Sequence, residues 1–306
     1  MRLLLIANES ASSVTARSRV IVTNALGTDH DLEVATTNRR GHATRLAEDA
    51  ARDGIDVVVV LGGDGTLNEA ATGLAGTTTA LGALPGGSTN VYARSLGFEN
   101  ESVAAVVQLL NALAAGSFRR VPIGVANGRT FLFHIGIGFD AAVVERVERR
   151  GHLKRWLGHP LFAYSTVMTH VRDYDHKTPN VRVVLDSGEE LPDTFELICL
   201  ASDPYTYLGS RALRLAARAD LNAGLALVSL TDLGFFKTAG NLAQAARAKP
   251  LNNRKGIGYR EAVRALTVSG ISRPIPYQVD GDFLGYVDSL SIAHQPAALR
   301  VVRPNF

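Results

Sequence analysis

Short apolar runs alternate with segments of helical periodicity along the first third of the chain. Four valines followed by a leucine at Val57–Leu61 are typical of a buried strand. Similar runs predict strands at Leu3–Ala7, Asp31–Thr36 and Ala80–Leu84. Helices are predicted at Thr15–Leu26, Ala43–Arg52, Thr66–Leu74, Thr89–Leu96 and Val103–Ala115, the last capped by Ser102. This order predicts a parallel, doubly wound α/β sheet that binds ligands at the carboxyl ends of its strands.

The pattern changes near Arg119–Val125, where strand-like runs bounded by Gly, Asn, Asp and Pro begin. These runs are Thr130–Ile135, Asn180–Leu185, Thr194–Ala201, Leu225–Leu230, Ala265–Ser269 and Tyr277–Val279, with helical insertions at Ala141–Tyr174 and Phe235–Ala248. They predict an antiparallel, β-sandwich-like domain. The 306 residues suit two domains, 1–122 and 123–306, with a last strand near 298–303 that can return to the first.

Composition indicates the class of partner and the cellular compartment, but it does not identify the chemistry. The chain is 46% hydrophobic and 20% charged, and its net charge of +3 gives no strong signal for a nucleic-acid partner. The single cysteine, Cys199, lies in an apolar run and is expected to be a buried thiol in a reducing cytoplasm. The start, MRLLLIANES, is too short an apolar stretch for a signal peptide, and no run approaches the roughly 18 apolar residues of a membrane span. We therefore expect a cytoplasmic protein whose membrane contacts are peripheral.

A glycine-rich turn, Gly62-Gly63-Asp64-Gly65-Thr66, follows the Val57–Leu61 strand and precedes a helix. This arrangement aims free backbone N–H groups and the positive end of a helix at a phosphate, and glycines let the phosphate approach the backbone. The alternative is a tight turn in which Asp64 or Thr66 caps the helix. The pattern is neither a Walker loop nor a Rossmann fingerprint.

A second glycine-rich loop, Leu84–Asn90, follows the next strand. Two neighbouring strands thus end in two such loops, a coincidence that separate Pro/Gly turns do not explain. Near the other end of the chain, Val279-Asp280-Gly281-Asp282 places two carboxylates around a glycine. In isolation that motif favours an Asp-Gly hairpin turn.

Taken together, the motifs resemble the diacylglycerol kinase/sphingosine kinase-like lipid kinase catalytic family, in its soluble bacterial branch. The resemblance covers nearly the whole chain in the right order. The matching segments are Asn8-Glu9-Ser10-Ala11, Thr37 with Arg40-Gly41-His42-Ala43, GGDGTLNE at 62–69, PGGSTN at 85–90, Gly136–Ala141 and Asp280-Gly281-Asp282.

The resemblance implies a fold like that of NAD kinase and diacylglycerol kinase, and ATP- and Mg²⁺-dependent phosphorylation of a lipid hydroxyl, with diacylglycerol converted to phosphatidic acid. The lipid would enter between the two domains. Asp282 would accept the hydroxyl proton, and Asp64 would orient the acceptor or the magnesium-bound phosphates and is the rival base. The implied nucleotide site comprises Asn8, Thr37, Gly62, Gly63, Asp64, Gly65, Thr66, Leu67, Asn68, Gly87, Ser88 and Asn90.

Several positions depart from the family pattern. Val91 stands where an acidic residue is usual, and Asp282 is one methylene shorter than the family's glutamate. Ala223 replaces the Asp that supplies the structural magnesium ligand. Asp220 and Leu225 are the remaining candidates for that site, which is expected to be weak or empty.

Two basic segments, Glu145–Trp156 and Arg247–Arg264, suit docking on an anionic membrane, although a solvated helix face explains either one alone. Other functions also stay open. An NAD kinase shares the Gly-Gly-Asp-Gly-Thr turn, and a nucleotide- or lipid-sensing module could keep the fold without catalysis. Among lipid kinases, a sphingoid base or a ceramide is the alternative acceptor, and the oligomeric state is not readable.

Overall fold

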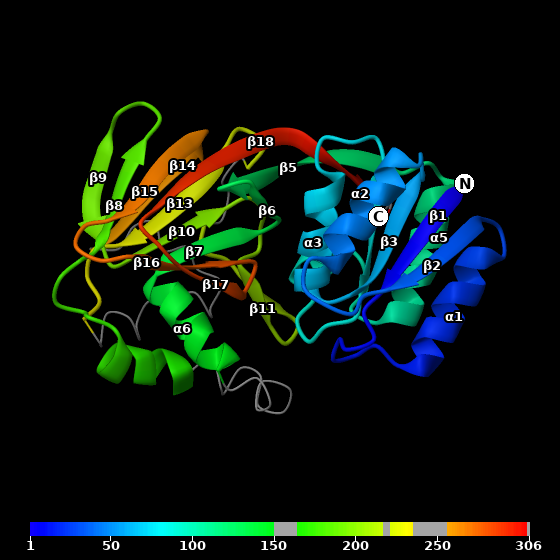
Figure 1. Ribbon diagram of the computed structural model, residues 1–306, viewed down its shortest axis with the longest axis horizontal. Coiled ribbons are helices and arrows are strands. Elements are labelled where there is room, and N and C mark those ends of the chain that lie inside the picture. Colours follow the sequence, from blue (N-terminus) through cyan, green and yellow to red (C-terminus); the bar gives the residue numbers. More distant parts are fainter. Residues whose placement is uncertain (150–163, 217–220, 235–255, 305–306) are drawn as a thin grey trace. The chain divides into compact units, whose positions relative to one another are not determined.

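The computed structural model describes residues 1–149, 164–216, 221–234 and 256–304 (Figure 1). The chain forms two compact units: Met1–Ile123 with Pro296–Phe306, and Gly124–Gln295. We call them unit 1 and unit 2. Strands β5 (Phe118–Ala126) and β18 (Ser289–Val302) each carry the chain from one unit to the other.

Unit 1 is built on a parallel sheet of short strands. These are β1 (Arg2–Ala7), β2 (Asp31–Thr36), β3 (Val57–Gly62) and β4 (Ala80–Pro85), in the order β2-β1-β3-β4 followed by the end of β18. Every residue of β3 and β4 is buried, as expected for central strands of a parallel sheet covered on both faces. Val301 of β18 pairs in parallel with Leu81 of β4.

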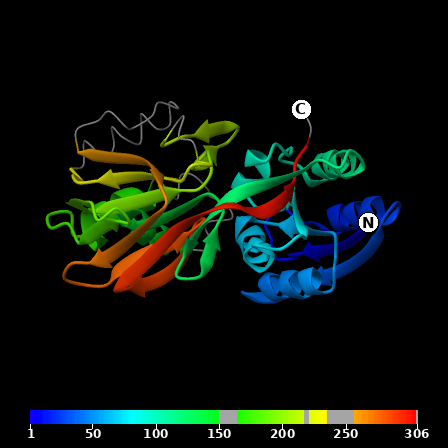
Figure 2. The same ribbon diagram turned by 90° about the horizontal axis from the view of Figure 1, so that it is seen from above.

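Five helices accompany this sheet: α1 (Ala16–Gly27), α2 (His42–Arg52), α3 (Asp64–Leu74), α4 (Val91–Ser95) and α5 (Ser102–Ala114). Figure 2 shows α1 and α5 on one face of the sheet, with α2 and α3 on the other. The predicted doubly wound α/β architecture is therefore confirmed.

Two details at the helix starts differ from the sequence prediction. Ser102 does not cap α5; the Glu101 carboxylate does, by accepting the backbone N–H groups of Val103 and Ala104, both at 2.9 Å. These two hydrogen bonds hold the pKa of Glu101 below its ordinary value. Helix α3 begins at Asp64, before the predicted Thr66, because Gly63 has the extended conformation of an N-cap.

Unit 2 contains two antiparallel sheets, so the predicted β-rich fold is also confirmed. One sheet has the order β14-β13-β10-β7-β16-β17, and the other runs β18-β15-β8-β9, with β5 paired to β18 and β6 paired to β5. Their bounds are β6 (Arg129–Phe131), β7 (His134–Gly138), β8 (Val181–Leu185), β9 (Glu190–Thr194), β10 (Glu196–Leu200), β13 (Leu225–Leu230), β14 (Ile257–Val263), β15 (Ala265–Gly270), β16 (Ile275–Val279) and β17 (Asp282–Val287). A separate hairpin pairs β11 (Thr206–Leu208) with β12 (Arg211–Leu213).

Strand β10 shows how side-chain alternation builds the core on both faces of the six-stranded sheet. Leu197 and Cys199 pack in a cluster with residues of the other sheet, whereas Ile198 and Leu200 pack in a second cluster with residues of helix α6 (Phe139–Glu148). Burial raises the pKa of the Cys199 thiol, as expected for an inert, buried cysteine.

Several strand limits in this unit were not predictable from local pattern. The run Thr130–Ile135 is divided between β6 and β7, and strands β9, β11, β12, β14 and β17 were not anticipated. Within the insertion Ala141–Tyr174, α6 already begins at Phe139; residues 164–168 are α-helical and continue into the π-helical turn η1 (Thr169–Asp173). The second insertion, Phe235–Ala248, lies outside the described residues.

Helix α2 is capped by a side chain from another helix. The N-cap residue Gly41 has a φ of 75° and provides no side-chain cap. Instead, Glu69 of α3 accepts the N–H of Gly41 at 2.8 Å through one carboxylate oxygen and that of Ala43 at 3.2 Å through the other. This contact explains why the glycine-rich signature ends in a glutamate.

We expect Glu69→Ala to lower the free energy of unfolding by about 1–2 kcal/mol, because it removes a cap and leaves two N–H groups without their acceptor. Urea unfolding measures the change. The control is Glu48→Ala, an exposed glutamate on α2 itself, which we expect to be nearly neutral. Equal losses in the two variants would contradict the capping role of Glu69.

Candidate active site

The carboxyl ends of four neighbouring parallel strands lie together at one edge of unit 1. Asn8 follows β1, Thr37 follows β2, Gly63 follows β3 and Gly86 follows β4. The register joins them pairwise: Ala7 pairs with Thr36 and with Leu61, and Gly62 pairs with Pro85. The residues predicted for the nucleotide thus gather where ligands bind in open α/β sheets.

The two glycine-rich loops pack backbone against backbone. A Cβ atom on Gly86 would lie 2.8 Å from the Cα atom of Gly62, and one on Gly87 would lie 2.8 Å from the Cα atom of Gly63. Such contacts have no room for a side chain, so the glycines are required by the contact between the loops. The N–H groups of Gly86 and Gly87 are themselves engaged, by the carbonyl oxygen of Gly62 at 2.9 Å and by Asn90 Oδ1 at 2.7 Å.

Asp64 fixes the second loop from the first. Its two carboxylate oxygens accept the N–H groups of Val91 and Tyr92, each at 3.0 Å, at the start of α4. The alternative in which Asp64 or Thr66 caps the following helix is therefore wrong, because α3 has no side-chain cap. Asp64 instead caps α4. A carboxylate at the N-terminus of a helix also interacts favourably with the helix dipole.

Asn8 and Asn90 complete the hydrogen bonding of the loops. Asn8 donates through Nδ2 to the hydroxyl of Thr66 at 2.9 Å. Asn90 has a left-handed backbone, with φ of 52°, and its Oδ1 accepts the N–H of Gly87 at 2.7 Å. Both asparagines therefore hold the loops together.

Burial divides the predicted nucleotide residues into two groups. Ser88 is exposed, and Gly63, Asp64, Gly65 and Gly87 are partly exposed. In contrast, the buried members pack inside the unit; they are Gly62, Thr66, Leu67, Asn68 and Asn90. The first group can contact a ligand directly, and the second supports the loops.

In unit 2, Asp280 and Gly281 form the two-residue turn between β16 and β17. Their φ values of 48° and 84° fit the type I′ hairpin turn that Asp-Gly favours. The Asp280 side chain is buried and accepts the N–H groups of Leu132, Phe133 and His134 at 2.7–3.0 Å. The hairpin expected for the isolated motif is present, and Asp280 anchors it to the segment between β6 and β7.

Asp282 begins β17 directly after this turn and pairs with Val279. The backbone on either side of it is fixed: Gln278 accepts the N–H of Gly281 at 2.8 Å, and Glu148 of α6 accepts the N–H of Phe283 at 3.0 Å. The Asp282 side chain is partly exposed, and no hydrogen bond or ion pair joins its carboxylate to another described residue. It is a carboxylate held in place by its neighbours and available to a ligand.

The segment Gly136–Ala141 surrounds a buried carboxylate, that of Asp140. Tyr205 donates to one oxygen of Asp140 and Gln278 to the other, both at 2.7 Å. A Cβ atom on Gly136 would lie 1.8 Å from the Asp140 Oδ2 atom. Gly138 has a φ of 85°, and a Cβ there would lie 2.2 Å from the carbonyl oxygen of Phe195. The glycines of this motif therefore make room for the carboxylate and for β10.

Glu196 of β10 is a second buried carboxyl group beside Asp140. Loss of solvation raises the pKa of both, and the charge of Asp140 raises the pKa of Glu196 further. Because Asp140 has two hydrogen-bond donors, we assign the negative charge to Asp140 and the proton to Glu196. Nearby His134 is buried, and its imidazole pKa is lowered by burial to about 3, so it is neutral.

Part of the chain is similar in sequence to known proteins. Residues 2–143 match the model of the diacylglycerol kinase catalytic domain. This match covers a little less than half of the chain. A Cronobacter sakazakii protein named "Probable lipid kinase YegS-like" is 35% identical over 162 residues, 51% of each chain. The Bacillus subtilis diacylglycerol kinase is 34% identical over 111 residues, 36% of each. The chain thus spans about half, or less, of the length of these relatives.

Solved structures extend the likeness in fold to nearly the whole chain. A Bacillus anthracis structure described as a diacylglycerol kinase superposes with a TM-score of 0.75 at 20% identity, covering 99% of this chain and 96% of its own. Yeast NADH kinase, complexed with NADH, superposes with a TM-score of 0.53 at 11% identity, covering 100% of this chain and 84% of its own. Both show the fold shared by diacylglycerol and NAD kinases.

The supporting roles of four residues near the motifs could not be predicted from the sequence. These residues are Glu69, Glu196, Tyr205 and Gln278, and each acts through a partner distant in the chain. Tyr205, for example, lies 65 residues from Asp140. Only Glu69 stands inside a recognised motif, and its position there gives no indication that it caps α2.

The residues named for the structural magnesium site fall partly outside the described part of the chain. Asp220 lies outside that part, Ala223 has no side-chain ligand, and Leu225 is buried in β13. Within the described parts of the chain, no group of three or more His, Cys, Asp or Glu side chains could hold a metal ion. We therefore assign no step to that site.

The two basic segments predicted to dock on a membrane are only partly described. Arg149 is ion-paired with Glu145 at 2.6 Å, and Arg260 with Glu189 at 2.7 Å. Residues 150–156 and 247–255 lie outside the described part. None of the helices that the structure does describe has both the length and the apolar content needed to cross a bilayer.

We expect the buried Glu196 carboxyl group to make the stability of the kinase fold depend on pH. The pKa of Glu196 is raised in the folded state. The contribution of this group to the free energy of unfolding is therefore complete at low pH and is lost as the pH rises above the ordinary glutamate pKa of 4.5. Each unit of pKa increase is worth about 1.4 kcal/mol. Glu196→Gln should therefore flatten the fall in unfolding free energy between about pH 5 and about pH 8.

Thermal and urea unfolding across this pH series make the measurement. The control is Glu190→Gln, which changes an exposed glutamate of neighbouring β9 and should leave the slope unchanged. If Glu196→Gln and the wild type fall equally with pH, Glu196 does not hold a proton in the folded state.

Proposed function

We propose that this protein is an ATP-dependent lipid kinase that phosphorylates diacylglycerol to phosphatidic acid, a step in phospholipid biosynthesis. The observation that carries the proposal is the backbone packing of the two glycine-rich loops at the ends of β3 and β4, inside a segment that matches the diacylglycerol kinase catalytic domain. Relatives named as lipid kinases support the acceptor class.

The nucleotide is assigned to the exposed edge of unit 1. There, Asp64 and Gly65 in the first turn of α3 are partly exposed and Ser88 is exposed, and the positive end of a helix favours phosphate. ATP brings Mg²⁺ as part of the substrate, where the ion neutralises phosphate charge. Asp64 keeps the second loop in position by holding α4.

Asp282 is assigned as the proton acceptor. As the lipid hydroxyl oxygen bonds to the γ-phosphorus, the bond from that phosphorus to the β–γ bridging oxygen breaks, ADP leaves, and the hydroxyl proton passes to the carboxylate. Asp282 suits this role better than Asp64, because both oxygens of Asp64 already accept backbone N–H groups. No described residue occupies the Asp282 carboxylate in that way.

The direct test is incubation of the purified chain with γ-labelled ATP, Mg²⁺ and a total lipid extract, followed by identification of the labelled product. We expect labelled phosphatidic acid. Separate reactions contain a sphingoid base, a ceramide or NAD as the acceptor. Label in NADP would establish the NAD kinase alternative, and ATP binding without any labelled product would establish a sensing module.

Asp282→Asn should lower turnover by about 10²-fold or more, because it removes the proton acceptor while leaving the hairpin intact. ATP affinity, measured by calorimetry, should change little. Asp282→Glu should keep appreciable activity, because the carboxylate remains. Asp288→Asn is the matched control, since it changes an exposed aspartate just after the same strand.

Asp64→Asn provides the contrasting result. It replaces one accepting oxygen with an NH₂ group opposite a backbone N–H, so we expect weaker ATP binding and lost turnover together. If Asp282→Asn has near wild-type turnover while Asp64→Asn is inactive with normal ATP binding, the base is Asp64.

A further inference from the structure

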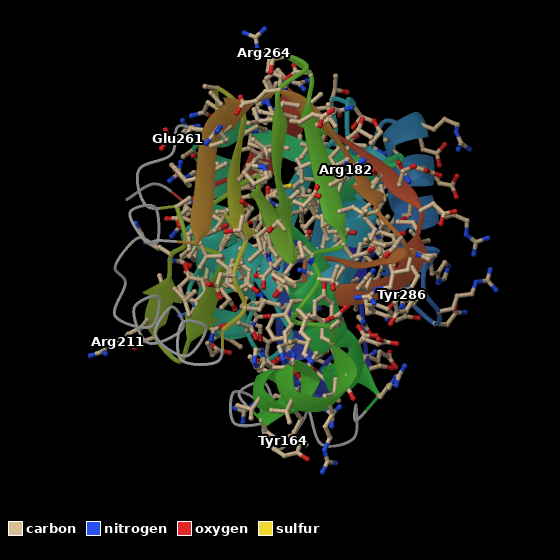
Figure 3. The ribbon with its side chains drawn as sticks, turned by 90° about the vertical axis from the view of Figure 1, so that its left-hand side faces the viewer. Tyr164, Arg182, Arg211, Glu261, Arg264 and Tyr286 are labelled. Atoms are coloured by element: carbon tan, nitrogen blue, oxygen red, sulfur yellow. The ribbon has the colours of Figure 1, made fainter. Side chains whose placement is uncertain are left out.

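The helical segment formed by residues 164–168 and η1 exposes apolar side chains to solvent. Tyr164 is 48% exposed, Val167 44% and Val171 61%. Their spacing of three and four residues places them on one face of the helix, and Figure 3 shows Tyr164 at the outer edge of unit 2. We call these three residues the apolar stripe.

The opposite face of this helix is polar and buried. Ser165 and Thr169 are fully buried, and Thr166 and His170 are 7% exposed. Among the described residues, the hydroxyl groups of Ser165 and Thr169 have no hydrogen-bond partner. The helix thus has hydroxyls inside and valines outside, the reverse of a helix on the surface of a protein in water.

This inverted arrangement is unfavourable when water surrounds the helix. Exposed valines lose the gain from burial, and buried hydroxyls without partners lose hydrogen bonds to water. The first cost disappears if the outer face contacts hydrocarbon. The stripe therefore indicates an apolar medium outside this face.

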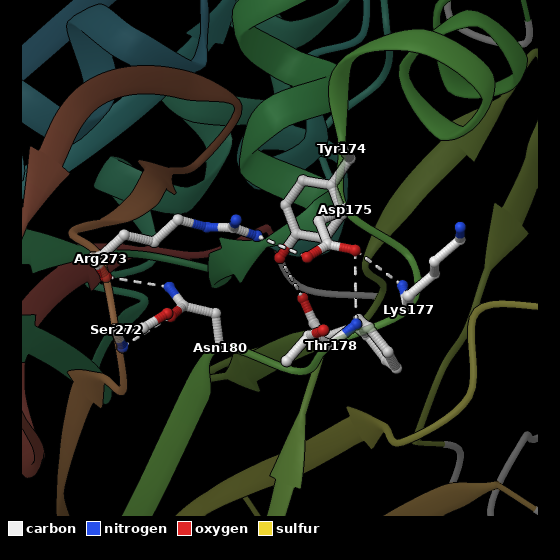
Figure 4. Close-up of polar contacts among 8 residues, drawn as sticks. Tyr174, Asp175, Lys177, Thr178, Asn180, Ser272 and Arg273 are labelled. Carbon is white, nitrogen blue, oxygen red and sulfur yellow. Dashed lines mark hydrogen bonds and ion pairs between the residues drawn. The ribbon is translucent and has the colours of Figure 1, made fainter.

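Firm contacts hold the helix in place at its carboxyl end, as Figure 4 shows. Tyr174 donates its hydroxyl to the carbonyl of Phe195 at 2.7 Å. Asp175 accepts the N–H groups of Lys177 and Thr178 and lies 3.7 Å from the Arg273 guanidinium. The exposed valines are therefore presented by an anchored segment.

Asn180 ties the following loop to the turn between β15 and β16. It accepts from Ser272 and donates to the carbonyl of Arg273 at 2.9 Å. At the helix itself, Asp173 forms an ion pair with Arg146 of α6. These contacts connect the segment that carries the stripe to the turn between β15 and β16 and to α6.

Beside the stripe, the acidic side chains are ion-paired and the basic ones extend to solvent. Asp173 and Asp175 are both paired with arginines, whereas Arg172 and Lys177 are exposed. Among the described residues, neither Arg172 nor Lys177 has an ion-pair partner. Two free cations next to exposed valines and a tyrosine complement a surface with negative headgroups above hydrocarbon.

We propose that the apolar stripe inserts into the boundary between headgroups and acyl chains of an anionic membrane, with Arg172 and Lys177 at the headgroups. This inference rests on the proposed lipid kinase function. A lipid kinase takes its acceptor from a membrane, so it needs a surface that binds one. The inference places the docking surface on residues 164–177, not on the basic segments expected from the sequence.

The test is sedimentation with vesicles of phosphatidylglycerol and phosphatidylcholine. We expect wild-type protein to sediment, and Val167→Asn together with Val171→Asn to weaken the partition coefficient at least about tenfold. The matched control changes Val20 and Val107 to Asn, two valines of α1 and α5 that are 58% and 54% exposed, and should bind normally. Arg172→Gln with Lys177→Gln should weaken binding to anionic vesicles only, and less so at high salt.

Circular dichroism confirms that each variant is folded. Wild-type protein that does not sediment, or a Val167/Val171 variant that binds normally, would overturn the proposal. So would a dimer, seen by light scattering, that this variant abolishes, since the stripe would then join two copies of the chain. Phosphorylation of a short-chain diacylglycerol dissolved as monomers tests the kinase activity separately: turnover without vesicle binding refutes only the docking surface, and binding without turnover refutes only the kinase.

Discussion

Carboxylates that accept backbone N–H groups from distant segments are the interaction on which both units depend. Asp64 holds the start of α4, Glu69 holds the start of α2, and Asp280 holds the segment before β7. Backbone N–H groups at the start of a segment lack partners in their own helix or strand, and leaving them unsatisfied is costly. Each carboxylate removes that cost and at the same time joins two pieces of chain.

This use of acidic residues changes how the glycine-rich motif is understood. Its glycines permit backbone contact between two loops, and its aspartate and glutamate orient two further helices. The motif therefore positions four segments of the chain, in addition to the phosphate-binding role proposed for it. Such positioning keeps the N–H groups in place before a ligand arrives, which is the condition for electrostatic preorganisation.

Unit 2 separates the roles of its acidic residues by environment. Asp280 is buried and accepts backbone N–H groups, and Asp140 is buried with two donors. The pKa of Glu196 beside it is raised by burial and by the charge of Asp140. Asp282 is the partly exposed member, and its backbone neighbours are held by Gln278 and Glu148. Gln278 contacts both Asp140 and the hairpin turn, so the buried carboxylate and the hairpin that carries Asp282 share one support.

The amino-acid sequence by itself determined the features that depend on neighbouring residues: the strands β1 to β4, the α/β order, the two glycine-rich turns and the Asp-Gly hairpin. Local backbone preference and hydrophobic period are sufficient for these. Tertiary structure decided which N–H groups Asp64 and Glu69 cap, that Glu101 and not Ser102 begins α5, and that Tyr205 and Gln278 meet at Asp140. It also decided that the helix after residue 163 turns its valines outward. A hydrogen bond between residues far apart in the chain, or the face that a helix buries, depends on how the segments pack, and neither is encoded in any short stretch of sequence.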